Sequence, residues 1–530
     1  MSELLWNKFK DESAFALYSP FFVCLAAGNL VSHTFYYCLG QELHFLKAFV
    51  HALKQAEEGA EGEFEENIIG YLKRREYKNL ESHDRFIKRM GFKLPKENIA
   101  ASFTIKYTDF LIETASGKIK IDGEEEKFET DCAYTLAAIA PCMRLYAHLC
   151  CQIKDILDHN DPNNMYKKWF NNNASQVFEE SARLVEGALQ NACCSFTRDE
   201  LELLDKVYHQ ALKFDIGFFA AQPIYQRTIV PLARENRSIT LMCEFDKTCI
   251  SLDSSHVLAA VSTVAVAKVA MVTAPDLSST WSSLFARYNK EVEECLENIM
   301  SRTEKKFNIG NLREALEDIG QIEKAINTRV EELGVLKGLT LDNIKRAGQN
   351  LNLQNGCISF LHKILKNESL RVDVHVLSHS WSGDIIRSAL SSDWNVEIEV
   401  HSNELAYDEE FVTTGEIVKK VECSSEKLRI VSDHIDEEED YTLNVYIGSS
   451  VRDLCCLVEA DIGIVIGSNP SLRKLGNHFG ISFIPLLSGL VRKQKQLSDD
   501  IHFSEIWKPV SCILYTVSNW TEIEALFLGL

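Results

Sequence analysis

The chain has 530 residues, enough for two or three domains with large apolar cores. Its 56 basic and 77 acidic residues give a formal net charge of −21, which argues against nucleic acid or an anionic membrane as the partner. The 16 cysteines include no CxxC pair, and adjacent pairs such as Cys150 and Cys151 fit reduced thiols better than a disulfide framework or a cysteine zinc site. We therefore expect small-molecule substrates and a reducing compartment.

The N-terminal stretch MSELLWNKFKDESAF contains neither an Arg-rich amphipathic presequence nor an apolar signal core. The longest apolar run, residues 257–274, is interrupted by Ser262, Thr263 and Lys268, so it predicts a buried helix rather than a membrane span. These features predict a cytoplasmic protein, and a mitochondrial form that begins at an upstream start stays open.

Residues 1–222 show helical periodicity and almost no strand pattern. Glu42 falls inside an apolar stripe that begins near Thr34, and Asp215 falls inside a second stripe near residue 212. A buried carboxylate without a partner is costly, so each acid needs a partner or a ligand. Two inward acids indicate a polar pocket in a helical bundle. The alternative is that each pairs with a buried Arg, Lys or Tyr for structural reasons.

Cys142 follows Pro141 inside another apolar helical pattern, AYTLAAIAPCMRLYAHL. The proline predicts a break or kink at that point. Tyr146 lies one turn later on the same side. A cysteine beside such a discontinuity is a candidate nucleophile, although a buried cysteine is more often inert filling.

Six segments of this region, in this order and spacing, resemble the TenA or thiaminase II family: SPFFVCLAAGNL, TFYYCLGQELHFLKAF, YTDFLIETASG, APCMRLY, MYKKW and FFAAQ. The resemblance implies an all-α fold, usually a homotetramer, that hydrolyses the C–N bond on the methylene of the thiamine pyrimidine. It also implies roles for individual residues. Cys142 would add to the ring, Tyr107, Tyr146 and Tyr166 would line the pocket, Glu42 would hold the amino group and Asp215 would move the proton.

This chain departs from that family at three of these positions. Glu42 stands where the family has Asp, Asp215 where it has Glu, and Phe45 where some members have Tyr. Each acid swap moves a carboxylate by one methylene, and a misplacement of about 1 Å can cost about 100-fold in rate.

A proline-containing stretch, residues 223–237, predicts a linker, and residues 238–530 then alternate strands with helices. Glu244 and Asp246 follow the first strand, Ser378 follows a later one, and Asp453 lies beyond a third. Lys427 lies between the last two. Ligands bind at the carboxyl ends of strands in such sheets.

This order of residues, with a helical insert at about 257–366, resembles the haloacid dehalogenase (HAD) phosphohydrolases. The resemblance implies an α/β Rossmann-like domain with a helical cap and a Mg²⁺ ion held by Glu244, Asp246 and Asp453. Glu244 would be the nucleophile, Asp246 the proton donor, Lys427 the cation and Ser378 a phosphate contact. The chain again departs from the pattern, because Glu244 and Ser449 both replace Asp and Arg452 replaces a small residue.

The two modules in tandem resemble the plant bifunctional TenA–HAD proteins of thiamine metabolism, whose HAD half is a thiamine monophosphate phosphatase. The resemblance implies a multidomain hydrolase that takes thiamine monophosphate and aminopyrimidine and forms homo-oligomers through its helical domain. Because four active-site acids are altered, a protein that binds thiamine fragments without turnover is the alternative. A scaffold without a small-molecule site is a third reading, which the inward acids disfavour.

Overall fold

We describe the chain from a computed structural model. The described residues are all except 1, 59–62, 90–98, 122–123, 128–131, 158–163, 270–273, 303–306, 392–397, 437–441, 498–505 and 508–511. They form two compact units. One contains Met1–Pro231, Leu490–Asp499 and Ala525–Leu530, and the other contains Leu232–Gly489 and Asp500–Glu524. The predicted boundaries at 222 and 238 do not anticipate that two short C-terminal stretches group with the first unit.

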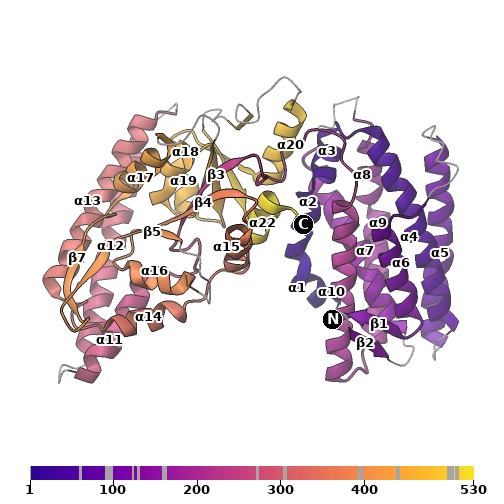
Figure 1. Cartoon of the computed structure of the whole chain (residues 1–530), viewed down its shortest axis with the longest axis horizontal. Helices are drawn as coiled ribbons and strands as arrows, with labels where there is room; N and C mark the ends of the chain where they lie inside the picture. The colour runs from indigo at the N-terminus through magenta and orange to yellow at the C-terminus, as the bar shows by residue number, and fades with distance from the viewer. Residues whose placement is uncertain are drawn as a thin grey trace. The chain divides into compact units, whose positions relative to one another are not determined.

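The N-terminal unit is a bundle of helices, as predicted (Figure 1). Helix α7 packs against α9 and α10, and α4 packs against α5 and α6. The helix starts are encoded locally: Ser19 caps α3 ahead of Pro20, and Thr197 and Glu200 form a reciprocal capping box on α10. The helices are α1 (Ser2–Phe9), α2 (Ser13–Leu17), α3 (Pro20–Ala27), α4 (Ser32–Glu58), α5 (Glu63–Arg89), α6 (Ser102–Ala115), α7 (Cys132–Lys154), α8 (Lys167–Asn173), α9 (Gln176–Ala192) and α10 (Arg198–Ala220).

Two details of this bundle differ from the prediction. Helix α7 runs without a break through Pro141, because its packing against neighbouring helices buries that stretch on most sides. A small antiparallel hairpin, β1 (Lys118–Ile121) and β2 (Glu124–Lys127), follows α6. The sequence between these strands is Asp-Gly, a pair that favours a two-residue hairpin turn and that the helical periodicity obscured.

The C-terminal unit is built on a parallel sheet, which confirms the predicted α/β class (Figure 1). Among the described residues the sheet has seven strands in the order β10-β11-β9-β8-β3-β4-β5. Strand β3, an interior strand of this sheet, is almost entirely buried, as expected when helices cover both faces of a parallel sheet. The strands are β3 (Ser238–Glu244), β4 (Arg371–Leu377), β5 (Glu399–His401), β8 (Leu443–Gly448), β9 (Ile462–Ile466), β10 (Ser482–Pro485) and β11 (Ile513–Val517).

The chain runs from β3 to β4 on one side and places β8 on the other, so the strand order reverses at β3. Such a reversal opens a crevice at the carboxyl ends of the strands. Glu244, Ser378 and Ser449 lie at these ends.

A helical insert separates β3 from β4, as predicted. It consists of α11 (Ser254–Val269), α12 (Ala274–Ser301), α13 (Ile309–Leu333), α14 (Leu341–Gln349) and α15 (Cys357–Lys366). A second, antiparallel sheet formed by β6 (Glu404–Tyr407) and β7 (Thr413–Val418) was not anticipated. The remaining helices are α16 (Gly383–Leu390), α17 (Ser424–Asp436), α18 (Leu454–Glu459), α19 (Pro470–His478), α20 (Leu486–Gln496) and α22 (Trp520–Leu528).

The stretch predicted as a linker, residues 223–237, contains neither helix nor strand. It is nevertheless well packed, because Ile229, Val230 and Leu232 are fully buried. The stretch is therefore part of the folded structure rather than a solvated tether.

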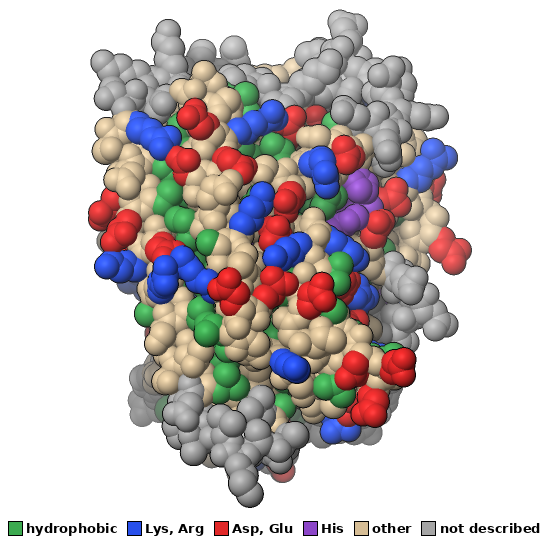
Figure 2. Space-filling model, turned by 90° about the vertical axis from the view of Figure 1, so that its left-hand side faces the viewer, with side chains coloured by type: hydrophobic (Ala, Val, Ile, Leu, Met, Phe, Trp, Pro, Cys, Tyr) green, Lys and Arg blue, Asp and Glu red, His purple; other side chains and the backbone are tan. Residues whose placement is uncertain are grey.

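Helix α7 is long and apolar enough to cross a membrane, but 72% of its most apolar window is buried inside the helical unit. Burial of this kind is typical of a core helix. The face of the C-terminal unit drawn in Figure 2 carries acidic and basic side chains intermixed, with hydrophobic side chains scattered among them. That face presents no continuous basic surface of the kind that nucleic acids require.

Candidate functional sites

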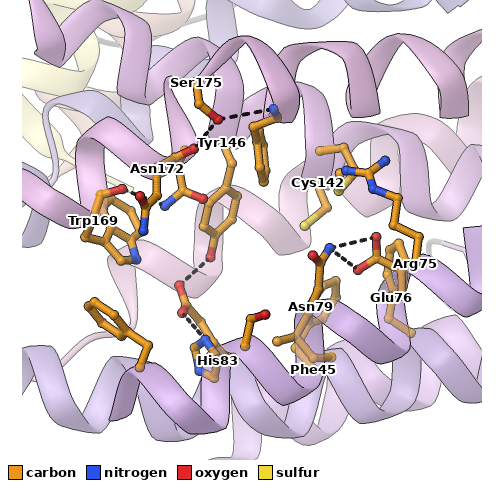
Figure 3. Close-up of a pocket in the computed structure, with 18 of the residues that line it drawn as sticks. Phe45, Arg75, Glu76, Asn79, His83, Cys142, Tyr146, Trp169, Asn172 and Ser175 are labelled. Atoms are coloured by element: carbon orange, nitrogen blue, oxygen red, sulfur yellow. Dashed lines mark hydrogen bonds and ion pairs between the residues drawn. The ribbon is translucent and has the colours of Figure 1, made fainter. Parts of the chain in front are cut away.

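The N-terminal unit encloses a cavity of about 410 Å³ (Figure 3). Its walls come from α4, α5, α7, α8 and the start of α9. The cavity is mostly apolar and aromatic, with a few convergent polar groups, which is the usual composition of a small-molecule site. Three predicted residues line it, namely Glu42, Cys142 and Tyr146.

Glu42 is buried on α4 and has polar partners on two other helices. The Tyr146 hydroxyl donates to Glu42 Oε1 at 3.0 Å, and His83 Nδ1 lies 3.8 Å from Glu42 Oε2 (Figure 3). Burial raises the pKa of the Glu42 carboxyl, while His83 and Tyr146 oppose the rise. The carboxyl group thus faces the cavity as a positioned acceptor for a ligand N–H group.

Cys142 has an acid immediately behind it. The Tyr107 hydroxyl donates to Asp215 Oδ1, while Asp215 Oδ2 is buried with no hydrogen-bond partner among the described residues. Burial raises the pKa of Asp215 to about 8, and burial followed by Asp215 raises the pKa of the Cys142 thiol well above its usual value. The thiol is therefore protonated at neutral pH, and Asp215, once it has ionised, is the group placed to take the thiol proton.

The structure brings together most of the predicted residues but not Tyr166. Its hydroxyl donates to the Leu30 carbonyl at 2.5 Å and its ring packs on Phe35, and Tyr166 is absent from the described cavity wall. Tyr107 and Asp215 form the layer behind Cys142 rather than the wall itself. We therefore correct the predicted role of Tyr166 from pocket lining to packing.

Helix α5 contributes a polar wall that the sequence prediction missed. Arg75, Glu76, Asn79 and His83 all face the cavity (Figure 3). Asn79 donates to both oxygens of Glu76 at 3.0 and 2.9 Å, and burial raises the pKa of Glu76. Glu76, Asn79 and His83 continue the helical stripe that begins with Ile69 and Leu72. The argument that selected Glu42 would have found them.

The C-terminal unit has its own cavity, of about 360 Å³, at the carboxyl ends of β3, β4 and β8. Glu244 and Asp246 both line it, because β3 ends at Glu244 and frees the next residues from strand geometry. Lys427, Ser378 and Asp453 lie directly behind these two acids and are fully buried.

Lys427 is the charge centre of this site. Its ammonium contacts Glu244 Oε2 and lies 3.1 Å from Asp453 Oδ1, and its side chain is 0% exposed. Burial disfavours the ammonium, yet Asp453 and Glu244 outweigh that effect and raise the pKa of Lys427. Burial raises the pKa of Glu244 and Lys427 opposes the rise. The lysine therefore stays charged and holds Glu244 at the cavity wall.

Both carboxylate oxygens of Asp453 accept hydrogen bonds from protein donors. The Tyr446 hydroxyl and Lys427 donate to Oδ1, while the amides of Ser449 and Ser450 and the Ser450 hydroxyl donate to Oδ2. Burial disfavours its charge, but Lys427 and Ser450 outweigh burial and hold its pKa below the usual value. Gly448 permits this approach, since a Cβ there would lie 2.7 Å from the Asp453 side chain.

Asp246 has the environment of a proton donor. The Ser254 amide donates to Oδ1 at 2.6 Å and the Ser378 hydroxyl donates to Oδ2 at 2.9 Å. Burial, followed by the nearby charge of Asp253, raises the pKa of Asp246 to about 6. Ser378 was predicted to contact phosphate; it is buried behind Asp246 and orients that acid.

Arg452, noted from the sequence only as a departure, faces the same cavity from the 3-10 turn η2 (Val451–Asp453), which precedes α18. Its Nε lies 2.6 Å from Glu323 Oε1 on α13, and its guanidinium donates to the Tyr288 hydroxyl on α12. Glu323 lies on an apolar stripe of α13 and was missed in the same way as Glu76. Arg452 links the sheet to the helical insert and supplies positive charge at the cavity wall.

Asp453 does not fit the predicted magnesium site in this arrangement. Its two carboxylate oxygens accept from five protein donors, and both oxygens of Glu244 also have donors. Ser449 supplies a hydroxyl where a second carboxylate is usual, and that hydroxyl accepts from Thr248 at 2.9 Å. Asp453, with five donors, is the clearest correction to the predicted ligands.

Replacing Lys427 by methionine is expected to lower the free energy of unfolding by about 3–5 kcal/mol, because two buried carboxylates lose their cation. The midpoint of urea unfolding measures the change. Lys420→Met is the matched control, since that side chain is 57% exposed and its loss should change stability by no more than about 0.5 kcal/mol. Equal midpoints for the two variants would show that Lys427 does not stabilise the acid cluster.

A family model and two solved structures each match part of the chain. A model described as the TENA/THI-4/PQQC family matches residues 12–223. Two solved structures resemble parts of the chain: a TenA homologue from P. horikoshii OT3 (20% identity, 41% of this chain, 95% of that chain, TM-score 0.34) and a phospho-aspartyl intermediate analogue of phosphoserine phosphatase (15% identity, 45% of this chain, 91% of that chain, TM-score 0.28).

One curated relative matches along almost the whole length. The protein named "Bifunctional TH2 protein, mitochondrial" from Arabidopsis thaliana is 43% identical over 549 residues, which cover 99% of this chain and 88% of that protein. Because this identity extends over both the helical domain and the α/β domain described above, the chain belongs to the family of the bifunctional TH2 protein.

Proposed function

We propose that the chain is a bifunctional hydrolase of thiamine metabolism and salvage. The N-terminal cavity hydrolyses aminopyrimidine, or thiamine, at the methylene carbon of the pyrimidine. The C-terminal cavity hydrolyses thiamine monophosphate to thiamine and phosphate. The observation that carries the proposal is that each unit has one cavity in which a nucleophile, a proton-transfer group and a ligand-holding group converge.

In the N-terminal cavity, Cys142 Sγ attacks the pyrimidine ring while Asp215 accepts the thiol proton. Glu42 accepts a hydrogen bond from the amino group of the ring, with Tyr146 and His83 fixing its position. The raised pKa of Asp215 makes its ionised form, which predominates above about pH 8, a stronger base for the thiol than an exposed carboxylate. With aminopyrimidine, Asp215 passes the thiol proton to the amine, which leaves the methylene as ammonia. Water then adds to the methylene carbon, and one of its protons returns to sulfur as the C–S bond breaks and the thiol is regenerated.

In the C-terminal cavity, Glu244 attacks phosphorus and forms an acyl phosphate, which water then cleaves. Asp246 protonates the departing alkoxide, and Ser378 and the Ser254 amide hold it in place. Lys427 opposes the effect of burial and so favours the ionised form of Glu244, and Arg452 faces the phosphoryl oxygens. Magnesium enters the proposal only through the family resemblance, and no step here depends on it.

A second candidate for the C-terminal cavity is binding of thiamine monophosphate without turnover. Two observations favour it: both oxygens of Glu244 already have donors, and Ser449 removes a carboxylate from the site. Phosphate release from thiamine monophosphate, measured with Mg²⁺ and with EDTA, separates the candidates. Release supports hydrolysis, whereas saturable calorimetric binding without release supports the second candidate.

Replacing Asp246 by asparagine is expected to lower phosphate release from thiamine monophosphate by at least about 100-fold, because the alkoxide then leaves without a proton. With p-nitrophenyl phosphate the loss should stay below about tenfold, since that leaving group needs no proton. In the unmodified protein, release from thiamine monophosphate should fall as pH rises above about 6, where Asp246 ionises. An equal loss with both substrates would remove Asp246 from this role.

Aminopyrimidine hydrolysis tests the other half of the proposal. Ammonia release from 4-amino-5-aminomethyl-2-methylpyrimidine should follow saturation kinetics and fall when Glu42 is replaced by alanine. Rates at the level of a protein-free blank would reject the N-terminal activity and leave the C-terminal one untouched.

A further inference from the structure

Three histidines and one glutamate meet at the edge of the parallel sheet, away from the cavity wall described above. His375 comes from β4, Glu399 and His401 come from β5, and His434 comes from the last turn of α17. One nitrogen or oxygen atom of each side chain lies within 4.8 Å of the corresponding atom of every other. Neither the family resemblance nor the proposed function uses these residues.

The sheet register creates this cluster. Strands β4 and β5 are parallel, with His375 opposite Glu399 and Leu377 opposite His401. Glu399 and His401 are two residues apart, so their side chains leave the same face of the strand. Helix α17 lies over that face and supplies His434.

The spacing among three of these side chains is close to that of a tetrahedral metal site. His375 Nδ1 lies 3.3 Å from both Glu399 Oε2 and His401 Nε2, and His401 Nε2 lies 3.6 Å from Glu399 Oε1. Ligands at 2.0–2.1 Å from a tetrahedral zinc ion are about 3.3 Å apart. These three side chains could therefore bind one ion with small side-chain adjustments.

His434 is held in the tautomer that a ligand needs. Its Nδ1 lies 2.8 Å from the Ile430 carbonyl oxygen, which can only accept, so Nδ1 carries the proton. The lone pair of Nε2 is then free for a metal. A backbone carbonyl that orients a ligating imidazole in this way is a recurring feature of metal sites.

We propose that His375, Glu399, His401 and His434 bind one Zn²⁺ ion that has a structural role. Imidazole and carboxylate ligands suit zinc, and four protein ligands complete its coordination without an open position. The ion would fasten the edge strand β5 and the end of α17 to β4. Lys427 lies two turns before His434 on α17, so the ion also steadies the helix that carries the active-site lysine.

Glu399 gives the ion a route in from solvent, because its side chain is 62% exposed. The same exposure makes Glu399→Gln a safe test variant. Its stability without metal should match that of the unmodified chain, while its affinity for zinc should fall.

The test uses the full-length chain without a histidine tag, stripped with a chelator and titrated with Zn²⁺ by calorimetry. We expect one equivalent to bind with a dissociation constant below 1 μM, by analogy with other structural sites. His401→Gln and His434→Gln should each weaken binding by more than about 100-fold, since even residues that only orient a ligand contribute about 10–100-fold. His51→Gln, an exposed histidine on α4, is the matched control and should bind as the unmodified chain does.

The absorption spectrum of bound cobalt(II) is a second readout. It reports the ligands of the metal rather than the stability of the fold. The Co²⁺-loaded chain should show the intense visible bands of four-coordinate cobalt and no thiolate charge-transfer band. The melting temperature should rise with Zn²⁺ in the unmodified chain and in His51→Gln but not in His434→Gln. Failure of the stripped chain to bind zinc, unchanged affinity in His401→Gln, or a thiolate band would each overturn the proposal.

Discussion

Replacing Cys142 by serine is expected to lower the rate of aminopyrimidine hydrolysis by about a thousandfold or more, because removal of a covalent nucleophile is among the largest single losses in enzymes. The hydroxyl occupies nearly the same volume at the cavity wall, so binding of the pyrimidine should change little. Stopped assays of ammonia release give kcat and KM. We expect kcat to fall and KM to change little.

Cys150→Ser is the matched control for that variant. Cys150 is a fully buried cysteine on the same helix, eight residues later, and it does not line the cavity. It should keep the unmodified rate while sharing any loss of stability from placing a hydroxyl in the helix. A rate that survives in Cys142→Ser would remove Cys142 from the mechanism and favour the reading of this cysteine as core filling.

Replacing Glu244 by glutamine is expected to lower phosphate release from thiamine monophosphate by about a thousandfold or more. The amide cannot attack phosphorus, and Lys427 loses one of its two buried counterions. Acid quenching should trap phosphate on the unmodified chain and not on the variant. Glu416→Gln, an exposed position on β7, is the control. Full activity in Glu244→Gln would assign the nucleophile to another group.

The double substitution Glu244→Asp with Ser449→Asp restores the acids of the family pattern. It distinguishes a site whose activity depends on Glu244 and Ser449 from a site that these residues have made less active. It shortens the nucleophile by one methylene and adds a carboxylate beside Asp453, whose Oδ2 accepts from the amide of residue 449. Among the described contacts only the Thr248 hydroxyl donates to the side chain at this position, and a neutral donor does not neutralise the added charge, so phosphate release should fall. A rise by orders of magnitude would show that the native site is degenerate.

The apolar stripes of the sequence were sufficient to locate the N-terminal cavity. Glu42 and Asp215 interrupt two such stripes, and both are buried on helices that converge on Cys142. The same signal was present for Glu76 and Glu323 but was obscured, because α5 and α13 are rich in exposed charge. A carboxylate within a charged helix is conspicuous only when the buried face is traced residue by residue.

Features that depend on contacts between distant segments could not be predicted in this way. Tyr166 matches the family pattern, but its hydroxyl is used by the Leu30 carbonyl. Asp453 follows a strand end like a metal ligand, yet the turn that it ends supplies donors to its carboxylate. The histidine cluster depends on the register of β5, a three-residue strand too short to give a pattern of its own.

Steady-state phosphate release from thiamine monophosphate by the unmodified full-length chain tests the central claim most directly. We expect phosphate release that saturates with thiamine monophosphate and is proportional to protein concentration. Release no faster than in a protein-free blank, at micromolar protein and with or without Mg²⁺, would contradict it.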